Sequence, residues 1–100
     1  MEKLSSRQRA HLKSLAHPLK PLLQIGKEGV SPAVAQTLDD AFRTRELLKV
    51  KVLESAPEDA DDTGAALAAA VADSQLVQVI GRTIVLYRAN PEEPEIRLPG

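Results

Sequence analysis

The 100-residue sequence contains no cysteine and no tryptophan, and Phe42 and Tyr87 are its only aromatic residues. The lack of cysteine excludes disulfides, thiolate metal sites and cysteine nucleophiles. The scarcity of aromatic rings removes the stacking platform on which single-strand readers of the RRM and OB types hold bases. No apolar run approaches the roughly 20 residues of a membrane span, and no signal-peptide core follows Met1, so we expect a cytosolic protein.

Charge of one sign is also scarce, because the formal net charge is only -1. The average hides an uneven layout. Residues 1–51 hold ten Lys or Arg against five Asp or Glu, whereas residues 52–100 hold three against nine, so balances of +5 and -6 sum to -1. Such asymmetry between halves points to a charged partner. Two solvated faces of opposite sign are an equally good interpretation at this point.

The length fits one domain, and the hydrophobic pattern predicts seven elements. Helices are expected at about 7–16, 32–44 and 63–73, and strands at about 22–25, 47–54, 76–80 and 83–88. The order α-β-α-β-α-β-β predicts a compact α/β sandwich with three helices and a mixed four-stranded sheet. Residues 90–100 carry three prolines and are expected to form a loosely held tail, in which Ile96 and Leu98 are candidates for docking on one edge.

Local signals support several of these boundaries. Ser5 with Gln8 three residues later matches a capping box, and Ser31 before Pro32 is an N-cap followed by proline at the first helical position. Thr63 and Ser6 are likewise interpreted as caps rather than nucleophiles. Gly81-Arg82 fits a two-residue type II′ hairpin turn. In strand 47–54, Leu48, Val50 and Val52 should share one face, with Lys49 and Lys51 on the other.

The loop Gly26-Lys27-Glu28-Gly29 lies between an expected strand and a capped helix. Backbone N–H groups and the positive helix end then converge at one place, which suits a phosphate, and Lys27 adds a positive charge. Glycines admit positive φ and let a sugar-phosphate backbone approach closely. Two glycines in four residues also occur by chance, and a plain tight turn is the competing interpretation.

The basic residues of the first half would form one patch if their elements are neighbours. Helix-end cations are stabilising by roughly 0.3–1 kcal/mol, which is an alternative role for Arg43 and Arg45. Lys49 and Lys51 can equally protect a strand edge from aggregation. The candidate nucleic-acid contacts besides Gly26, Lys27, Glu28 and Gly29 are Arg7, Arg9, Lys13, Lys20, Arg43, Arg45, Lys49 and Lys51.

Four ordered motifs together resemble the bacterial YhbY family, the stand-alone form of the CRM domain, named for chloroplast RNA splicing and ribosome maturation. They are HLKSLAHPLKP at 11–21, GKEG at 26–29, LLKVKV at 47–52 and VQVIGRTIVLYR at 77–88. The resemblance implies an RNA-binding domain similar in fold to the C-terminal domain of translation initiation factor three. It also implies contact of the glycine loop with RNA backbone and a link to precursors of the large ribosomal subunit. Residues 54–73 show no family motif, so a binding role for that face has no support.

Other chemistry finds no constellation in the sequence. His11 and His17 differ by about 240° around a helix, and adjacent Asp39 and Asp40 diverge by about 100°. The acidic run at 58–62 lacks a calcium-loop pattern, and no nucleotide-binding or hydrolase motif occurs. We therefore expect no catalytic site, metal or cofactor. The hypothesis is a monomeric, non-catalytic protein that binds structured ribosomal RNA during large-subunit assembly. The alternative is an adaptor whose acidic half docks a ribosomal protein or assembly factor.

Overall fold

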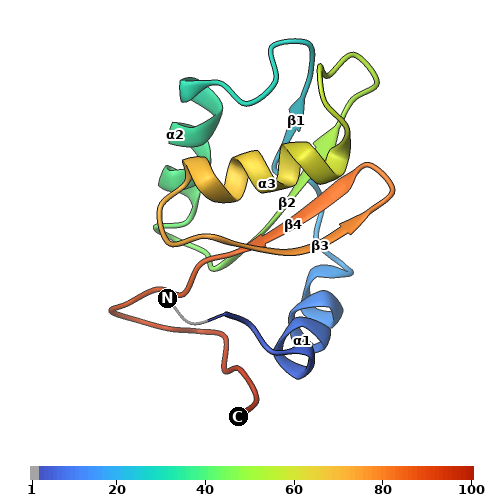
Figure 1. Cartoon of the computed structure of the whole chain (residues 1–100). Coiled ribbons are helices and arrows are strands. Elements are labelled where there is room, and N and C mark those ends of the chain that lie inside the picture. Colours follow the sequence, from blue (N-terminus) through green and yellow to red (C-terminus); the bar gives the residue numbers. More distant parts are fainter. Residues whose placement is uncertain (1–2) are drawn as a thin grey trace.

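The computed structural model describes residues 3–100 and contains three helices and a four-stranded sheet (Figure 1). This architecture confirms the predicted α/β class and the mixed sheet. The elements in chain order are α1 (Ser6–Ala16), β1 (Leu23–Ile25), α2 (Pro32–Ala41), β2 (Leu47–Val52), α3 (Ala60–Ala70), β3 (Gln75–Ile80) and β4 (Thr83–Tyr87). No helix within residues 3–100 is long and apolar enough to cross a membrane.

The strands lie in the order β1-β2-β4-β3, with β1 parallel to β2 and β4 antiparallel to both of its neighbours. The β3–β4 hairpin turns at Gly81-Arg82. Gly81 has a φ of +57°, whereas Arg82 is outside the positive-φ region, which is the combination that a type II′ turn requires. The carbonyl of Arg82 accepts the N–H of Val52 at 2.7 Å, so the hairpin tip lies beside the end of β2.

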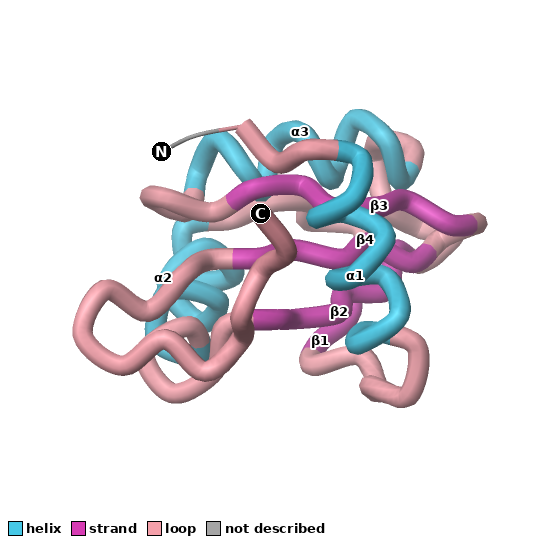
Figure 2. The backbone as a smooth tube through the Cα atoms, turned by 90° about the horizontal axis from the view of Figure 1, so that it is seen from below, coloured by secondary structure: helices cyan, strands magenta, loops and turns pink. Residues whose placement is uncertain are grey.

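Helices cover the sheet on both faces, and each face has its own apolar core. Helices α2 and α3 cover the face that carries Val50, Ile84 and Leu86. The other face packs against α1 and the C-terminal segment, as Figure 2 shows from below. Because side chains alternate along a strand, Lys49 and Lys51 share the face opposite Val50, as the sequence predicted, and the structure shows that this face is on the α1 side.

The helix starts follow their capping residues. Ser5 accepts the N–H of Gln8 in a complete capping box, and Ser31 accepts the N–H of Val34, so both predicted caps are confirmed. The predicted start of the third helix is wrong. Asp59 accepts the N–H of Asp62 at 2.8 Å and begins α3 three residues earlier.

Thr63 and Ser6 are therefore not caps. Thr63 is a buried residue inside α3, and Ser6 is the first residue of α1. Aspartate is a strong N-cap, and the acidic run continues directly into the alanine-rich segment, so helix formation begins at the earlier polar residue. Helix α2 and strand β2 also end earlier than expected, at Ala41 and Val52.

The C-terminal segment is attached to the domain through Glu46, a carboxylate that is only 4% exposed. It accepts backbone N–H groups from Asn90 at 2.6 Å and from Glu95 and Ile96 at 2.7 Å each. Ile96 and Leu98 pack against the core on the α1 side. Burial raises the pKa of Tyr87, and the nearby negative charge of Glu46 acts in the same direction. How loosely residues 90–100 move stays a prediction.

Candidate nucleic-acid interface

Helix α1 leaves part of its side of the sheet uncovered, towards the β3–β4 hairpin. The strand register places two rows of side chains there: Gln78, Val85 and Lys49 in one, and Ile80, Thr83, Lys51 and Gln24 in the next. We call these two rows the open sheet face. In Figure 2 the hairpin ends of β3 and β4 project past α1. The polar and cationic side chains of the open sheet face and Ile80 are at least partly exposed, whereas Val85 between them is buried.

A hollow of about 330 Å³ lies where the end of α1 meets the open sheet face. Lys13 and His17 line it from the helix side, and Lys49, Gln78 and Ile80 line it from the sheet. The ammonium group of Lys49 donates to the carbonyl oxygen of His17 at 3.4 Å. No carboxylate of residues 3–100 lines this basic hollow, so the two lysines give it a positive charge.

A second hollow, of about 360 Å³, continues from Lys49 towards the connector between α1 and β1. Lys20 and Arg45 line it, and within the described part of the chain no carboxylate does. The structure thus brings predicted contacts from four separate segments onto one side of the domain. The basic surface, as we use the term, consists of Lys13, Lys20, Arg45, Lys49 and Lys51.

Three predicted arginines lie outside the basic surface. Arg9 is partly buried and donates to the carbonyls of Leu76 and Val77, at 2.8 and 3.0 Å. This contact stabilises edge strand β3 where a bulge shifts its register. Arg43, just beyond the end of α2, is within 4 Å of Asp39 and Asp40 in the last turn of that helix, so its charge is partly compensated. Arg7 is exposed in the first turn of α1, at the other end of that helix from the basic hollow.

The glycine loop is a tight turn in which the N–H of Gly29 donates to the carbonyl of Gly26 at 2.9 Å. Gly29 has a φ of +63°, and a Cβ there would lie 3.0 Å from Cγ of Pro57. Its missing side chain therefore serves packing against the β2–α3 connector. A Cβ at Gly26 would meet only ordinary contacts, the nearest 3.6 Å from Oγ of Ser55. Lys27 and Glu28 are exposed at the tip.

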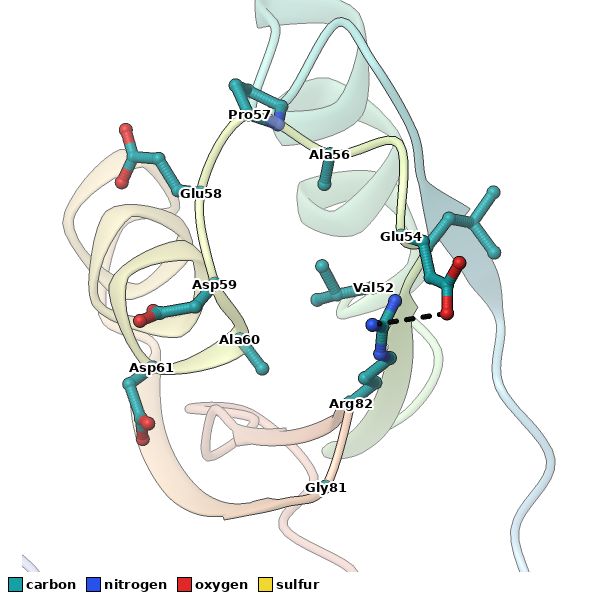
Figure 3. A pocket seen from close by; sticks show the side chains of 11 residues that line it. Val52, Glu54, Ala56, Pro57, Glu58, Asp59, Ala60, Asp61, Gly81 and Arg82 are labelled. Carbon is teal, nitrogen blue, oxygen red and sulfur yellow. Dashed lines mark ion pairs between the residues drawn. The ribbon is translucent and has the colours of Figure 1, made fainter.

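An acidic edge lies on the other side of the glycine loop. It consists of Glu54, Glu58, Asp59, Asp61 and Asp62, at the end of β2 and the start of α3. Four of these carboxylates line a hollow of about 380 Å³ (Figure 3), in which Arg82 pairs with Glu54 at 3.5 Å. Glu58, Asp59 and Asp61 point away from Arg82 in this view. The loop therefore has acidic surroundings on its α3 side.

Sequence reasoning missed Gln78 and Ile80 as parts of the cationic side of the domain. Their position depends on β4 lying between β2 and β3, which aligns Gln78 with Val85 and Lys49 across three strands. The sequence signal was the hairpin itself, because its register decides which β3 side chains share the face of the lysines. Among residues 3–100 no group of three or more metal-ligating side chains converges.

Arg88 also escaped the sequence analysis, and its position assigns it a structural role. Its guanidinium lies 2.7 Å from Oδ1 of Asp39 and 5.0 Å from the centre of the Phe42 ring. It also donates to the carbonyl of Ala72 beyond the end of α3. The hydrogen bond from Arg88 holds the pKa of Asp39 below its usual value, and the nearby Arg43 charge acts in the same direction.

The fold and this surface define a small α/β domain with one cation-lined sheet face and an acidic edge. Residues 4–88 match the family model described as the CRS1 / YhbY (CRM) domain, and the chain belongs to this family. It is 44% identical over 96 residues to "Probable RNA-binding protein YqeI" of Bacillus subtilis, a match that covers 96% of this chain and 99% of the relative. It is 38% identical to an "RNA-binding protein" of Haemophilus influenzae, with 99% and 98% covered.

A solved structure has the same fold. The solution structure of a Staphylococcus aureus protein, titled "a putative RNA binding protein", superposes with a TM-score of 0.81 at 42% identity. The match covers 97% of this chain and 100% of that one. The family resemblance that the four motifs indicated is therefore confirmed.

Proposed function

We propose that the protein is a non-catalytic RNA-binding protein that holds structured ribosomal RNA during assembly of the large ribosomal subunit in the cytoplasm. The observation that carries this proposal is the basic surface. Four of its cations, from α1, the α1–β1 connector, the α2–β2 connector and β2, line two hollows that no carboxylate of residues 3–100 lines, and Lys51 follows two residues after Lys49 on the same face. Relatives that match nearly the whole chain are named RNA-binding proteins, which supports the choice of polyanion.

Binding on this surface works mainly through phosphates. Lysine ammonium groups neutralise phosphate charge and release bound counterions, which supplies most of the affinity but little sequence information. Lys27 at the tip of the glycine loop would extend the contact along the RNA backbone. The acidic edge repels phosphate from the α3 side of that loop. RNA is therefore expected to approach from the α1 side of the sheet.

The perturbed ionisable groups support a role without catalysis. The hydrogen bond from Arg88 lowers the pKa of Asp39, and burial raises the pKa of Tyr87 in the core on the α1 side. Both shifts have structural causes at positions away from the basic hollow. A catalytic site would instead join shifted groups in one accessible pocket with convergent geometry.

The test of this proposal combines crosslinking with salt-dependent binding. Ultraviolet crosslinking in cells, followed by sequencing of the attached RNA, should recover ribosomal RNA from large-subunit precursors. The purified protein should bind such RNA with an affinity that falls steeply as salt rises. Recovery of only messenger or transfer RNA would refute the assembly role, and binding insensitive to salt would refute the phosphate contact.

A second candidate function is an adaptor in which the acidic edge docks a basic ribosomal protein or assembly factor. The hollow of about 380 Å³ with four carboxylates favours it. The variant Glu58→Lys/Asp61→Lys separates the two functions, because both residues are exposed and reversal should not disturb the core. Loss of co-purifying basic proteins with RNA binding intact would support the adaptor. Unchanged protein partners with tighter RNA binding would support RNA as the sole partner.

A further inference from the structure

We propose that the basic hollow and the adjoining open sheet face hold one unpaired nucleotide of the bound RNA, with its base packed on Ile80 and its polar edge paired with the Gln78 side-chain amide. This inference rests on the proposed RNA binding and adds a base-reading contact to it. Phosphate contacts alone would make the protein indifferent to whether the RNA is paired at this point. We call the site formed by Gln78, Ile80 and the basic hollow the base site. The base site makes the protein prefer RNA in which one base lies outside the double helix.

Among residues 3–100, Ile80 is the most exposed of the large apolar side chains, with 60% of its surface accessible. It belongs to edge strand β3 and stands directly before the hairpin turn, opposite Thr83. An aliphatic side chain here gains from contact with an apolar partner, since burial of its surface is favourable by about 25 cal/mol per Å². The flat face of a base supplies such a partner where aromatic rings are absent.

Gln78 supplies the polar component. It is partly buried, and its side-chain amide has no hydrogen-bond partner among residues 3–100. An amide presents one acceptor and a donor side by side, the arrangement that pairs in a bidentate manner with a base edge. Because Gln78 aligns with Val85 and lines the hollow together with Ile80, the amide and the apolar surface address the same space.

The cations are placed to hold the phosphates of the same nucleotide. Lys49 and Lys51 belong to β2, two strands from β3 across β4, and are separated by about 6.6 Å along their strand. Lys13 and His17 border the hollow on the helix side. A nucleotide consists of an anionic group, a flat apolar face and a hydrogen-bonding edge. The hollow offers cations, an exposed aliphatic side chain and an unpaired amide.

Access to the basic hollow decides whether a paired or an unpaired base of the RNA can enter it. The hollow lies between α1 and the sheet, and a base inside a double helix presents its face to its stacked neighbours. Proteins read RNA sequence mostly at loops, bulges and ends, where bases turn outward and expose both face and edge. The base site is therefore expected to select a bulge or loop within an otherwise structured RNA.

The experiment uses the full-length protein and a set of RNA hairpins that differ only at one position of the stem. Four hairpins carry a single bulged A, C, G or U, and a fifth is fully paired. The wild-type protein should bind at least one bulged hairpin roughly 5- to 10-fold tighter than the paired one, the lower end of the discrimination that one good bidentate pair provides. Gln78→Ala should remove differences among the four bulged bases, and Ile80→Ser should reduce the preference for bulged over paired RNA.

Gln36→Ala is the matched control, because Gln36 is exposed on α2 and bonds to Asp40 on the opposite side of the sheet. In an NMR titration of the wild-type protein with bulged RNA, the side-chain amide signal of Gln36 should stay in place while that of Gln78 shifts. Lys49→Ala separates this inference from the proposed function. If Lys49→Ala weakens binding to all five hairpins but Gln78→Ala and Ile80→Ser change none of the affinity ratios among the hairpins, the proposed RNA binding stands and the base site is refuted. If the protein binds none of the hairpins, both are refuted.

Discussion

Lys49 donates through its ammonium group to the carbonyl oxygen of His17, the residue at which α1 ends, at a distance of 3.4 Å. The last carbonyls of a helix carry partial negative charge, so a lysine there is stabilised and kept near one position. The contact joins the middle of the sheet to the end of α1. It also keeps the positive charge of Lys49 on the boundary between the two hollows, because Lys49 lines both of them.

Substitution of Lys49 by alanine should weaken RNA binding more than substitution of a cation outside the basic surface. Removal of one phosphate contact is expected to lower the slope of log affinity against log salt by about 0.7–0.9. The control is Arg43→Ala, because Asp39 and Asp40 already compensate that charge. Binding isotherms at several salt concentrations measure both effects. An equal loss in the two variants would mean that the net charge of the protein matters and the basic surface does not.

The two glycines of the loop should behave differently when changed to alanine. Gly29→Ala is expected to destabilise the fold by about 1–2 kcal/mol, because its φ of +63° is unfavourable for a side chain and Pro57 leaves little space. Gly26→Ala meets only ordinary contacts and should unfold at nearly the wild-type urea concentration.

Gly26→Ala is therefore the cleaner probe of the loop in RNA binding. A lower RNA affinity with unchanged stability would indicate close approach of the backbone at Gly26. Normal affinity in Gly26→Ala, together with normal affinity in Lys27→Ala, would assign the loop a purely structural role.

Local contacts explain which parts of the fold the sequence predicted. Ser5 and Ser31 cap helices by bonding to amides three residues away, so the motif contains all that determines it. The common face of Lys49 and Lys51 follows from strand alternation alone. The third helix was placed too late because Asp59 and Thr63 are both capping residue types, and only the structure shows which one bonds.

Contacts between distant segments explain what the sequence did not predict. Arg9 appeared to be a surface cation, but it donates to carbonyls 67 and 68 residues away. Gln78 and Ile80 became part of the site only through the insertion of β4 between β2 and β3. The compensation of Arg43 was accessible from sequence, since Asp39 and Asp40 are four and three residues before it in a segment expected to be one helix.

Arg88 and Asp39 predict a pH dependence of stability. Because the pKa of Asp39 is lowered in the folded protein, its charge stabilises the fold above its usual value of 3.8. This contribution is lost as the pH falls through the lower, folded value. The unfolding temperature of Asp39→Asn should be lower than that of the wild type at pH 7, and the difference between the two temperatures should narrow below about pH 4.

Arg88→Ala should be the more damaging of the two changes, since it also removes the contacts with Phe42 and with the carbonyl of Ala72. We expect its unfolding temperature to fall by roughly 5–10 °C at pH 7. Arg82→Ala serves as control, because Arg82 is exposed and its partner Glu54 is exposed as well. A difference between Asp39→Asn and wild type that persists unchanged at low pH would contradict the charge-based explanation.

Glu46 should decide whether the C-terminal segment stays attached. Its carboxylate accepts three backbone N–H groups from residues 90–96, and hydrogen bonds to a charged group contribute about 1.5–3 kcal/mol each when buried. Glu46→Gln keeps an acceptor but loses the charge, and Glu46→Ala loses both. The amides of Glu95 and Ile96 should therefore exchange with deuterium faster in the glutamine variant and fastest in the alanine variant. Glu92→Gln is the matched control, because the side chain of Glu92 is exposed in the same segment.

If the amides of Glu95 and Ile96 exchange equally fast in the wild type and all variants, residues 90–100 move freely and Glu46 does not anchor them. If exchange quickens as expected, loss of the anchor should also uncover Ile96 and Leu98, and the α1-side core should become less stable in urea.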